Sequence, residues 1–299
     1  MIQCYSTLRS HFGKICFSAA RPRHSANRPA RLWLSAALAA LILILAPVPA
    51  LLAQGASKPK KFEITDNSFF IEEAFNQERG VVQHIFSALR SRGRDSDPNT
   101  WDFSFTQEWP LSGMRHQFSY TIPGSSTDNQ ESGLGDVLLN YRFQAAEEER
   151  NGFAMAPRVS FIIPTGSERK GLGEGSPGMQ VNLPISRQVS DVYFHFNTGG
   201  TWFPGAASEF HSYNLGASVI WRTNSRLNLM TEFLGLAERT RADERTAWRY
   251  PVIAVPGFRT AIDVGSTQIV WGAGVPLGIT NAAPPRGVFL YFSVEHPFQ

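Results

Sequence analysis

From about Thr100 to the C-terminus, apolar and polar residues alternate in short stretches, and the connections between these stretches are alternately long and short. In residues 101–106, for example, Trp and two Phe interleave with Asp, Ser and Thr, and residues 117–122 and 136–144 repeat the pattern. Successive side chains of a β-strand point to opposite faces, so each set occupies one face. The pattern predicts strands with one apolar and one polar face.

The alternation predicts twelve strands, which is an even number. We expect them at 81–90, 101–110, 114–122, 136–144, 153–163, 178–186, 192–203, 213–222, 227–237, 249–259, 267–279 and 287–298. Short turns on one side and longer loops on the other are typical of bacterial outer-membrane barrels. The predicted fold class is therefore all-β: an up-and-down antiparallel transmembrane β-barrel of about 12 strands. An exported soluble β-sandwich also alternates, but it has no reason to sort its loops by length.

The N-terminus has the features of a cleaved export signal. Residues 1–31 contain six basic residues and no acid, and an apolar run from Leu32 to Ala46 follows. A basic region, an apolar region and a small-residue cleavage site make such a signal. We predict a signal peptide at 1–53, with cleavage near 50–56. The alternative is a membrane-anchoring helix over 32–53, since a spanning helix needs about 20 residues.

Charge and cysteine content change once this leader is set aside. The chain has 28 basic and 25 acidic residues; six of the basic residues and none of the acids lie in 1–53, which leaves 22 and 25. The basic character thus belongs to the leader, and we expect no nucleic-acid partner. Both cysteines, Cys4 and Cys16, also lie there, so the exported part offers no disulfide and no thiolate metal site. We expect no metal and no cofactor.

Residues 62–90 allow two interpretations. Phe70, Ala74 and Phe75 have roughly helical spacing, whereas residues 81–88 alternate as a strand. We favour a short helical or irregular segment at 66–78 followed by the first strand, because eleven strands would place the termini on opposite sides. This assigns 54–80 to an N-terminal periplasmic segment and 81–299 to the barrel. Glu72, Glu73 and Glu78 then face either solvent or the barrel mouth.

The last strand ends in Phe298, followed only by Gln299. Its alternation places Val288, Leu290 and Phe292 outward. An aromatic residue at this position resembles the signal that the outer-membrane barrel-assembly machinery reads. We therefore assign Phe298 as an assembly signal and that machinery as a partner, together with outer-membrane lipids.

Function depends on the inward-facing set. Charged side chains on the lipid face cost about 2–4 kcal/mol at the midplane, so we expect the charges inside the barrel. Those that we assign to the pore lining are Arg142, Arg158, His195, Glu232 and Glu295. Barrels of about eight strands are filled and those of 16–18 leave an aqueous channel, so twelve strands leave both an open and a plugged lumen possible.

Three segments, 133–143, 157–167 and 173–186, resemble in order and spacing the motifs of outer-membrane proteins named for the phenol-degradation meta-pathway. The resemblance covers roughly residues 80–298. It implies a porin-like channel or transporter for small, aromatic or hydrophobic solutes. The alternatives are a structural or adhesion barrel with a plugged lumen, and an outer-membrane hydrolase. We expect no enzyme and no catalytic residues, because no G-x-S-x-G or H-E-x-x-H string is present.

Overall fold

The computed structural model describes residues 64, 66–111, 113–205, 211–242 and 245–298. The predicted signal peptide and its cleavage site lie outside these residues. Within the described part, no helix is long and apolar enough to cross a membrane. Almost all regular structure is β.

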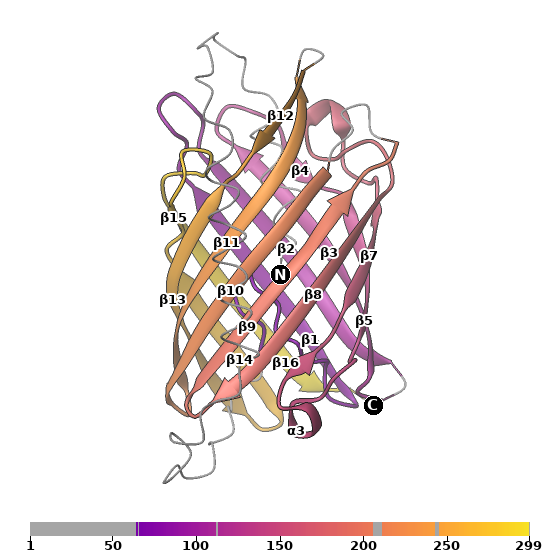
Figure 1. Ribbon diagram of the computed structural model, residues 1–299, viewed down its shortest axis with the longest axis vertical. Helices are drawn as coiled ribbons and strands as arrows, with labels where there is room; N and C mark the ends of the chain where they lie inside the picture. Colours follow the sequence, from indigo (N-terminus) through magenta and orange to yellow (C-terminus); the bar gives the residue numbers. More distant parts are fainter. Residues whose placement is uncertain (1–63, 65, 112, 206–210, 243–244, 299) are drawn as a thin grey trace.

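Twelve long strands form one antiparallel sheet that closes on itself, as Figure 1 shows. The wall strands are β1 (Val81–Ser91), β2 (Thr100–Leu111), β3 (His116–Thr127), β5 (Val137–Phe143), β7 (Arg158–Ile163), β8 (Gly178–Val189), β9 (Val192–Trp202), β10 (His211–Asn224), β11 (Leu227–Ala242), β13 (Val252–Val264), β14 (Thr267–Gly274) and β16 (Gly287–Pro297). Each strand pairs with its neighbours along the chain. The barrel closes because β1 pairs with β16 from Val81↔Pro297 to Ser91↔Gly287.

Short elements decorate the two ends. They are β4 (Ser132–Leu134), β6 (Ala154–Met155), β12 (Arg245–Arg249), β15 (Leu277–Gly278), the helical turn α3 (Glu148–Asn151) and a 3-10 turn (Glu168–Lys170). α3 and the C-terminus lie at the end with the tight turns, and β4 and β12 lie at the opposite end (Figure 1). By the loop asymmetry of bacterial barrels, the first end is periplasmic and the second is extracellular.

The predicted strands are confirmed, with shifts at their ends. The largest difference is at 153–163, where the chain forms β6 and β7 with a break at Ala156 and Pro157. Proline has no N–H for a ladder, and here its carbonyl accepts from the amide of Phe143 instead. Similarly, β14 ends at Gly274, shortly before Pro276, rather than at 279.

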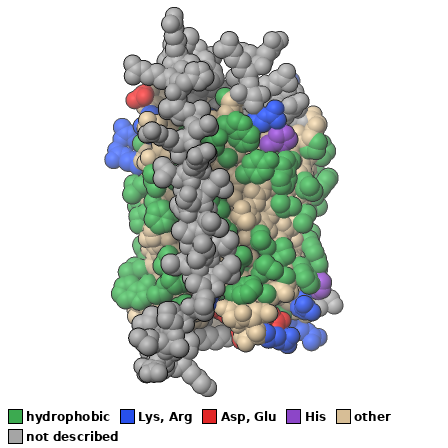
Figure 2. All heavy atoms as spheres, viewed as in Figure 1, with side chains coloured by type: hydrophobic (Ala, Val, Ile, Leu, Met, Phe, Trp, Pro, Cys, Tyr) green, Lys and Arg blue, Asp and Glu red, His purple; other side chains and the backbone are tan. Residues whose placement is uncertain are grey.

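The two faces of the wall differ in polarity. Large apolar side chains stand about half exposed on the outside, among them Phe103, Phe161, Trp221, Phe233 and Trp271. Figure 2 shows such side chains covering the middle of one face of the barrel, with charged and histidine side chains towards its ends. On the same strands, polar side chains such as Asp102 and Ser104 are buried inside. An apolar outer face and a polar inner face are typical of a bacterial outer-membrane barrel, which is surrounded by lipid.

Phe233 tests the lipid-facing assignment. It lies near the middle of β11, opposite Ala217 and Ala254, and is 49% exposed. We expect Phe233→Arg to lower the free energy of unfolding by about 2–4 kcal/mol, because an arginine at the midplane must leave water. Urea unfolding in phospholipid vesicles measures this change. Phe233→Leu is the control, and equal stability of the two variants would contradict the assignment.

Candidate functional site: a filled barrel lumen

Residues 66–77, here called the interior segment, run inside the barrel. Phe69, Phe70 and Ile71 are at most 1% exposed, and Glu72 and Glu73 are also buried. The segment is irregular, without a helix. The periplasmic position predicted for residues 54–80 is thus wrong for residues 66–77, whose side chains pack against the inner face of the wall. Residues 54–63 and 65 lie outside the described residues.

Side chains of the wall satisfy the backbone of the interior segment. The amides of Phe69 and Phe70 donate to the two carboxylate oxygens of Glu232, at 2.8 and 2.7 Å. Asn197 accepts from the amide of Glu72 at 2.7 Å and donates to its carbonyl at 2.8 Å. Further amide donors reach Ser186, Gln144 and Gln117. Because buried backbone groups need partners, these side chains replace the neighbouring strand that the segment lacks.

Two ion pairs link the acids of the interior segment to the wall. Nε of Arg158 lies 2.7 Å from Oε1 of Glu72, and Nη1 of Arg259 lies 2.9 Å from Oε1 of Glu73. All four side chains are at least nine-tenths buried. Removing one partner of such a pair leaves an uncompensated buried charge, which typically costs about 3–5 kcal/mol. The pairs therefore fix the position of the segment.

Arg142 binds the next part of the interior segment through its backbone. Its guanidinium donates to the carbonyl of Phe75 at 2.5 Å and to Oδ1 of Asn76 at 3.0 Å. On the wall side it lies 3.7 Å from Glu108 and donates to Gln117 at 3.1 Å. Arg142 thus has an acidic neighbour in the wall itself.

The other end of the interior segment is held by hydroxyl groups. Asp66 accepts hydrogen bonds from Tyr291 at 2.5 Å and from Ser293, both on β16. Gln83 on β1 donates to the same carboxylate at 2.5 Å. Asp66 therefore contacts both strands of the pair that closes the barrel.

Apolar packing surrounds the aromatic part of the interior segment. The ring of Phe289 lies 5.1 Å from that of Phe69 and 4.7 Å from that of Phe70, between centroids. Two wall glycines allow the close approach. A Cβ at Gly257 would lie 2.6 Å from the Phe69 ring, and one at Gly216 would overlap Cδ1 of Ile71. Glycine at these wall positions makes room for the segment.

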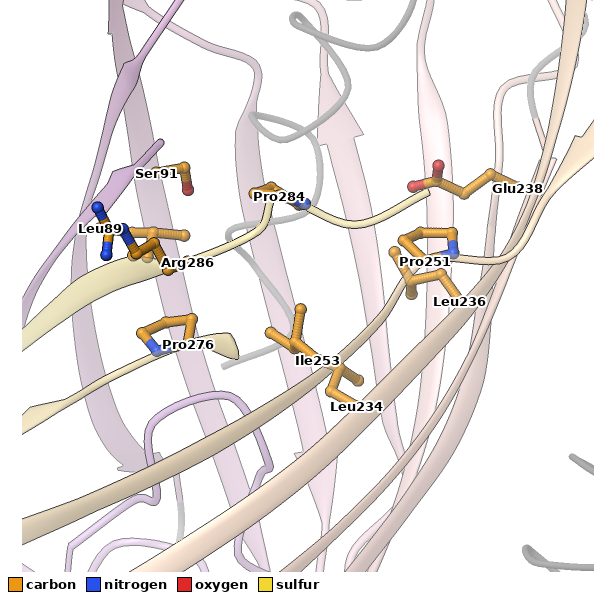
Figure 3. Close-up of a pocket in the computed structure, with 11 residues that line it drawn as sticks. Leu89, Ser91, Leu234, Leu236, Glu238, Pro251, Ile253, Pro276, Pro284 and Arg286 are labelled. Atoms are coloured by element: carbon orange, nitrogen blue, oxygen red, sulfur yellow. The ribbon is translucent and has the colours of Figure 1, made fainter. Parts of the chain in front are cut away.

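A small apolar cavity, with a water-accessible volume of about 30 Å³, lies at the extracellular end of the lumen, next to this packing. As Figure 3 shows, its lining comes from β1, β11, β13 and the connections between β14 and β16, with Leu234, Ile253 and Pro284 among the residues. Glu238 and Arg286 also line it. Leu234 belongs to the same buried cluster as Phe69 and Phe70, although no residue of the interior segment lines the cavity itself.

The structure brings four of the predicted lumen residues together. Arg142, Arg158 and Glu232 contact the interior segment directly. His195 is fully buried, with Nδ1 2.7 Å from Oγ of Ser186 and Nε2 3.8 Å from Oε1 of Glu73. Glu295 faces inward but lies apart from them, opposite Gln83 and Gln268. These side chains therefore line a filled lumen.

Phe298, the predicted assembly signal, lies at the periplasmic end and is 42% exposed. Its amide donates to the carbonyl of Gly80 at 2.8 Å, which ties the end of the barrel to its start. That the barrel-assembly machinery recognises Phe298 stays a prediction.

Sequence reasoning missed the interior segment as a component of the site. The available signal was the run Phe69-Phe-Ile-Glu-Glu73, which joins bulky apolar residues directly to two acids just before the first strand. Such a run fits neither face of a strand, and its partners are far away in sequence. Arg259 is a further central contact: the alternation predicts that it faces the lumen, but not that it binds Asp66, Asn67 and Glu73.

Comparisons with known proteins place the fold. No protein-family model and no curated protein sequence matches the chain. An outer-membrane channel from Pseudomonas putida F1 aligns with a TM-score of 0.59 at 13% identity, over 75% of this chain and 98% of that one. The β domain of a Bordetella autotransporter aligns with a TM-score of 0.45 at 10% identity, over 74% and 100%. The chain thus has the fold of outer-membrane barrels.

Gly216 tests the fit of the interior segment. A methyl group added in Gly216→Ala must displace Ile71, and overpacking of this kind costs about 1–3 kcal/mol. We expect faster hydrogen exchange over residues 66–77. Adding Ile71→Val removes the overlapping Cδ1 atom and is expected to restore protection, with Ile71→Val alone as the control. Unchanged exchange in Gly216→Ala would show that the segment does not pack there.

Proposed function

We propose that the protein is a gated outer-membrane channel for small apolar or aromatic solutes, and that the interior segment is its gate. The observation that carries this proposal is the way in which the segment is held. Its contacts come mainly from polar side chains of the wall, which water can bind equally well after the segment leaves. A wall of this polarity is suited to an aqueous passage.

The wall does not need the interior segment to close. β1 and β16 pair over eleven residue pairs, and all twelve wall strands bond to neighbours in the sheet. Withdrawal of the segment therefore breaks no strand pairing. A permanently filled structural or adhesion barrel is the second candidate, and the buried Phe69 and Phe70 rings favour it, because their exposure opposes opening.

The extracellular cavity supports the solute class. Leucine, isoleucine and proline dominate its lining, so it presents apolar surface at the extracellular end of the lumen. Leu89, Leu234 and Leu236 of this lining belong to the buried cluster that contains Phe69 and Phe70. A small apolar solute entering from outside thus meets apolar surface before it reaches the polar contacts of the gate. The resemblance to the phenol-pathway proteins is in keeping with this class.

Currents in planar bilayers test the gate. Glu72→Ala leaves Arg158 buried without its carboxylate partner in the closed state, at a cost of about 3–5 kcal/mol. We expect this variant to be open roughly 100-fold more often than the parent protein, since about 1.4 kcal/mol corresponds to a factor of ten. Glu78→Ala, on the same stretch but exposed, is the matched control and is expected to behave as the parent.

A deletion separates the two candidate functions. A chain without residues 66–77, checked for folding by heat-modifiable migration in detergent gels, is expected to conduct continuously. A folded deletion variant that carries no current, together with a silent Glu72→Ala, would leave the structural barrel as the better account.

A further inference from the structure

Arg158 is a buried wall cation whose wall partners are all neutral. It donates to Oδ1 of Asn140 at 3.1 Å, to Ser160, and to Oε1 of Gln180 at 2.8 Å. Among the described residues, the carboxylate within ion-pair distance is that of Glu72, from the interior segment. Arg142 differs, because Glu108 of the wall lies 3.7 Å away. When the gate opens, Arg158 loses the carboxylate of Glu72, just as Arg259 loses that of Glu73.

The wall already has the geometry of a carboxylate site. Arg158 on β7 and Asn182 on β8 are register partners, so their side chains stand side by side on the inner face. Nε of Arg158 lies 2.7 Å from Oε1 of Glu72 as an ion pair, and Nδ2 of Asn182 donates a hydrogen bond to Oε2 at 2.9 Å. Both wall side chains are about 3% exposed. The ion pair and the hydrogen bond from Asn182 to the charged carboxylate together hold it at two points.

Apolar space adjoins this site. Phe70 and Ile71, directly before Glu72, occupy the recess formed by Phe289 and the wall at Gly216. A small gap, with a water-accessible volume of about 10 Å³, lies beside the carboxylate and is lined by Glu72, Arg142 and Arg158 among others. The wall therefore offers an apolar surface and a two-point carboxylate site within a few residues of one another, and the interior segment occupies both.

We propose that the interior segment is a built-in stand-in for the solute, and that the channel selects small apolar or aromatic carboxylic acids. The solute carboxylate takes the place of the Glu72 side chain on Arg158 and Asn182, and its apolar body takes the place of Phe70 or Ile71. Glu108 and Glu232 also face the lumen, but Gln117 and the backbone of the interior segment bind them in the closed state. This inference rests on the proposed function.

The test compares an acid with its uncharged analogue. In the full-length Glu72→Ala variant at pH 7, 3-phenylpropanoate and 3-phenylpropanamide are added on the extracellular side of a planar bilayer. We expect the acid to interrupt the current at a concentration at least about tenfold lower than the amide, because a hydrogen-bonded charge is lost in the amide. Adding Arg158→Gln is expected to abolish this difference. Adding Arg90→Gln, on the outer wall, is the matched control.

Two results would overturn this inference without contradicting the channel function. One is equal block of the current by the acid and the amide; the other is stronger block by the acid that persists after Arg158→Gln. If the variant carries no current, the proposed function fails, and calorimetric titration of the same folded proteins in detergent still compares the two probes. Tighter binding of the acid that depends on Arg158 then supports the site, and equal or absent binding overturns it.

Discussion

Inside a bilayer, every backbone N–H and C=O must find its partner within the protein, and the rest of this structure depends on that constraint. The pairing of β1 with β16 meets it, because closure leaves the wall without a free edge. Closure also creates an enclosed lumen, whose inner face alternation makes polar. Whether solutes can pass the barrel depends on what occupies that lumen.

The interior segment fills the lumen, and side chains of the wall bind its backbone in place of a neighbouring strand. Glu232 and Asn197 each accept from backbone amides, and Arg158 and Arg259 receive the acids. Ion pairs in such surroundings are costly to break and weak as sources of net stability. The arrangement is therefore better suited to specifying one position of the segment than to stabilising the barrel.

The wall could be predicted from the sequence, because period-two alternation is a local signal that persists through each strand. It placed Arg142, Arg158, His195 and Glu232 on the inner face, as the structure shows. It could not identify what they contact, since alternation defines a face and not its occupant. The amide of Phe69, for instance, bonds to a carboxylate 163 residues away. Strand ends shifted where a proline interrupts the ladder, as at Pro157.

Gly80 joins the interior segment to β1, and its carbonyl is bonded to the amide of Phe298. The segment is thus tethered to the wall by only a few residues. A short tether keeps a released group at a local concentration of about millimolar or more, so that rebinding becomes an intramolecular event. On the proposed function, each opening of the lumen would be brief, because the tethered Glu72 stays close to Arg158 and competes with a bound solute.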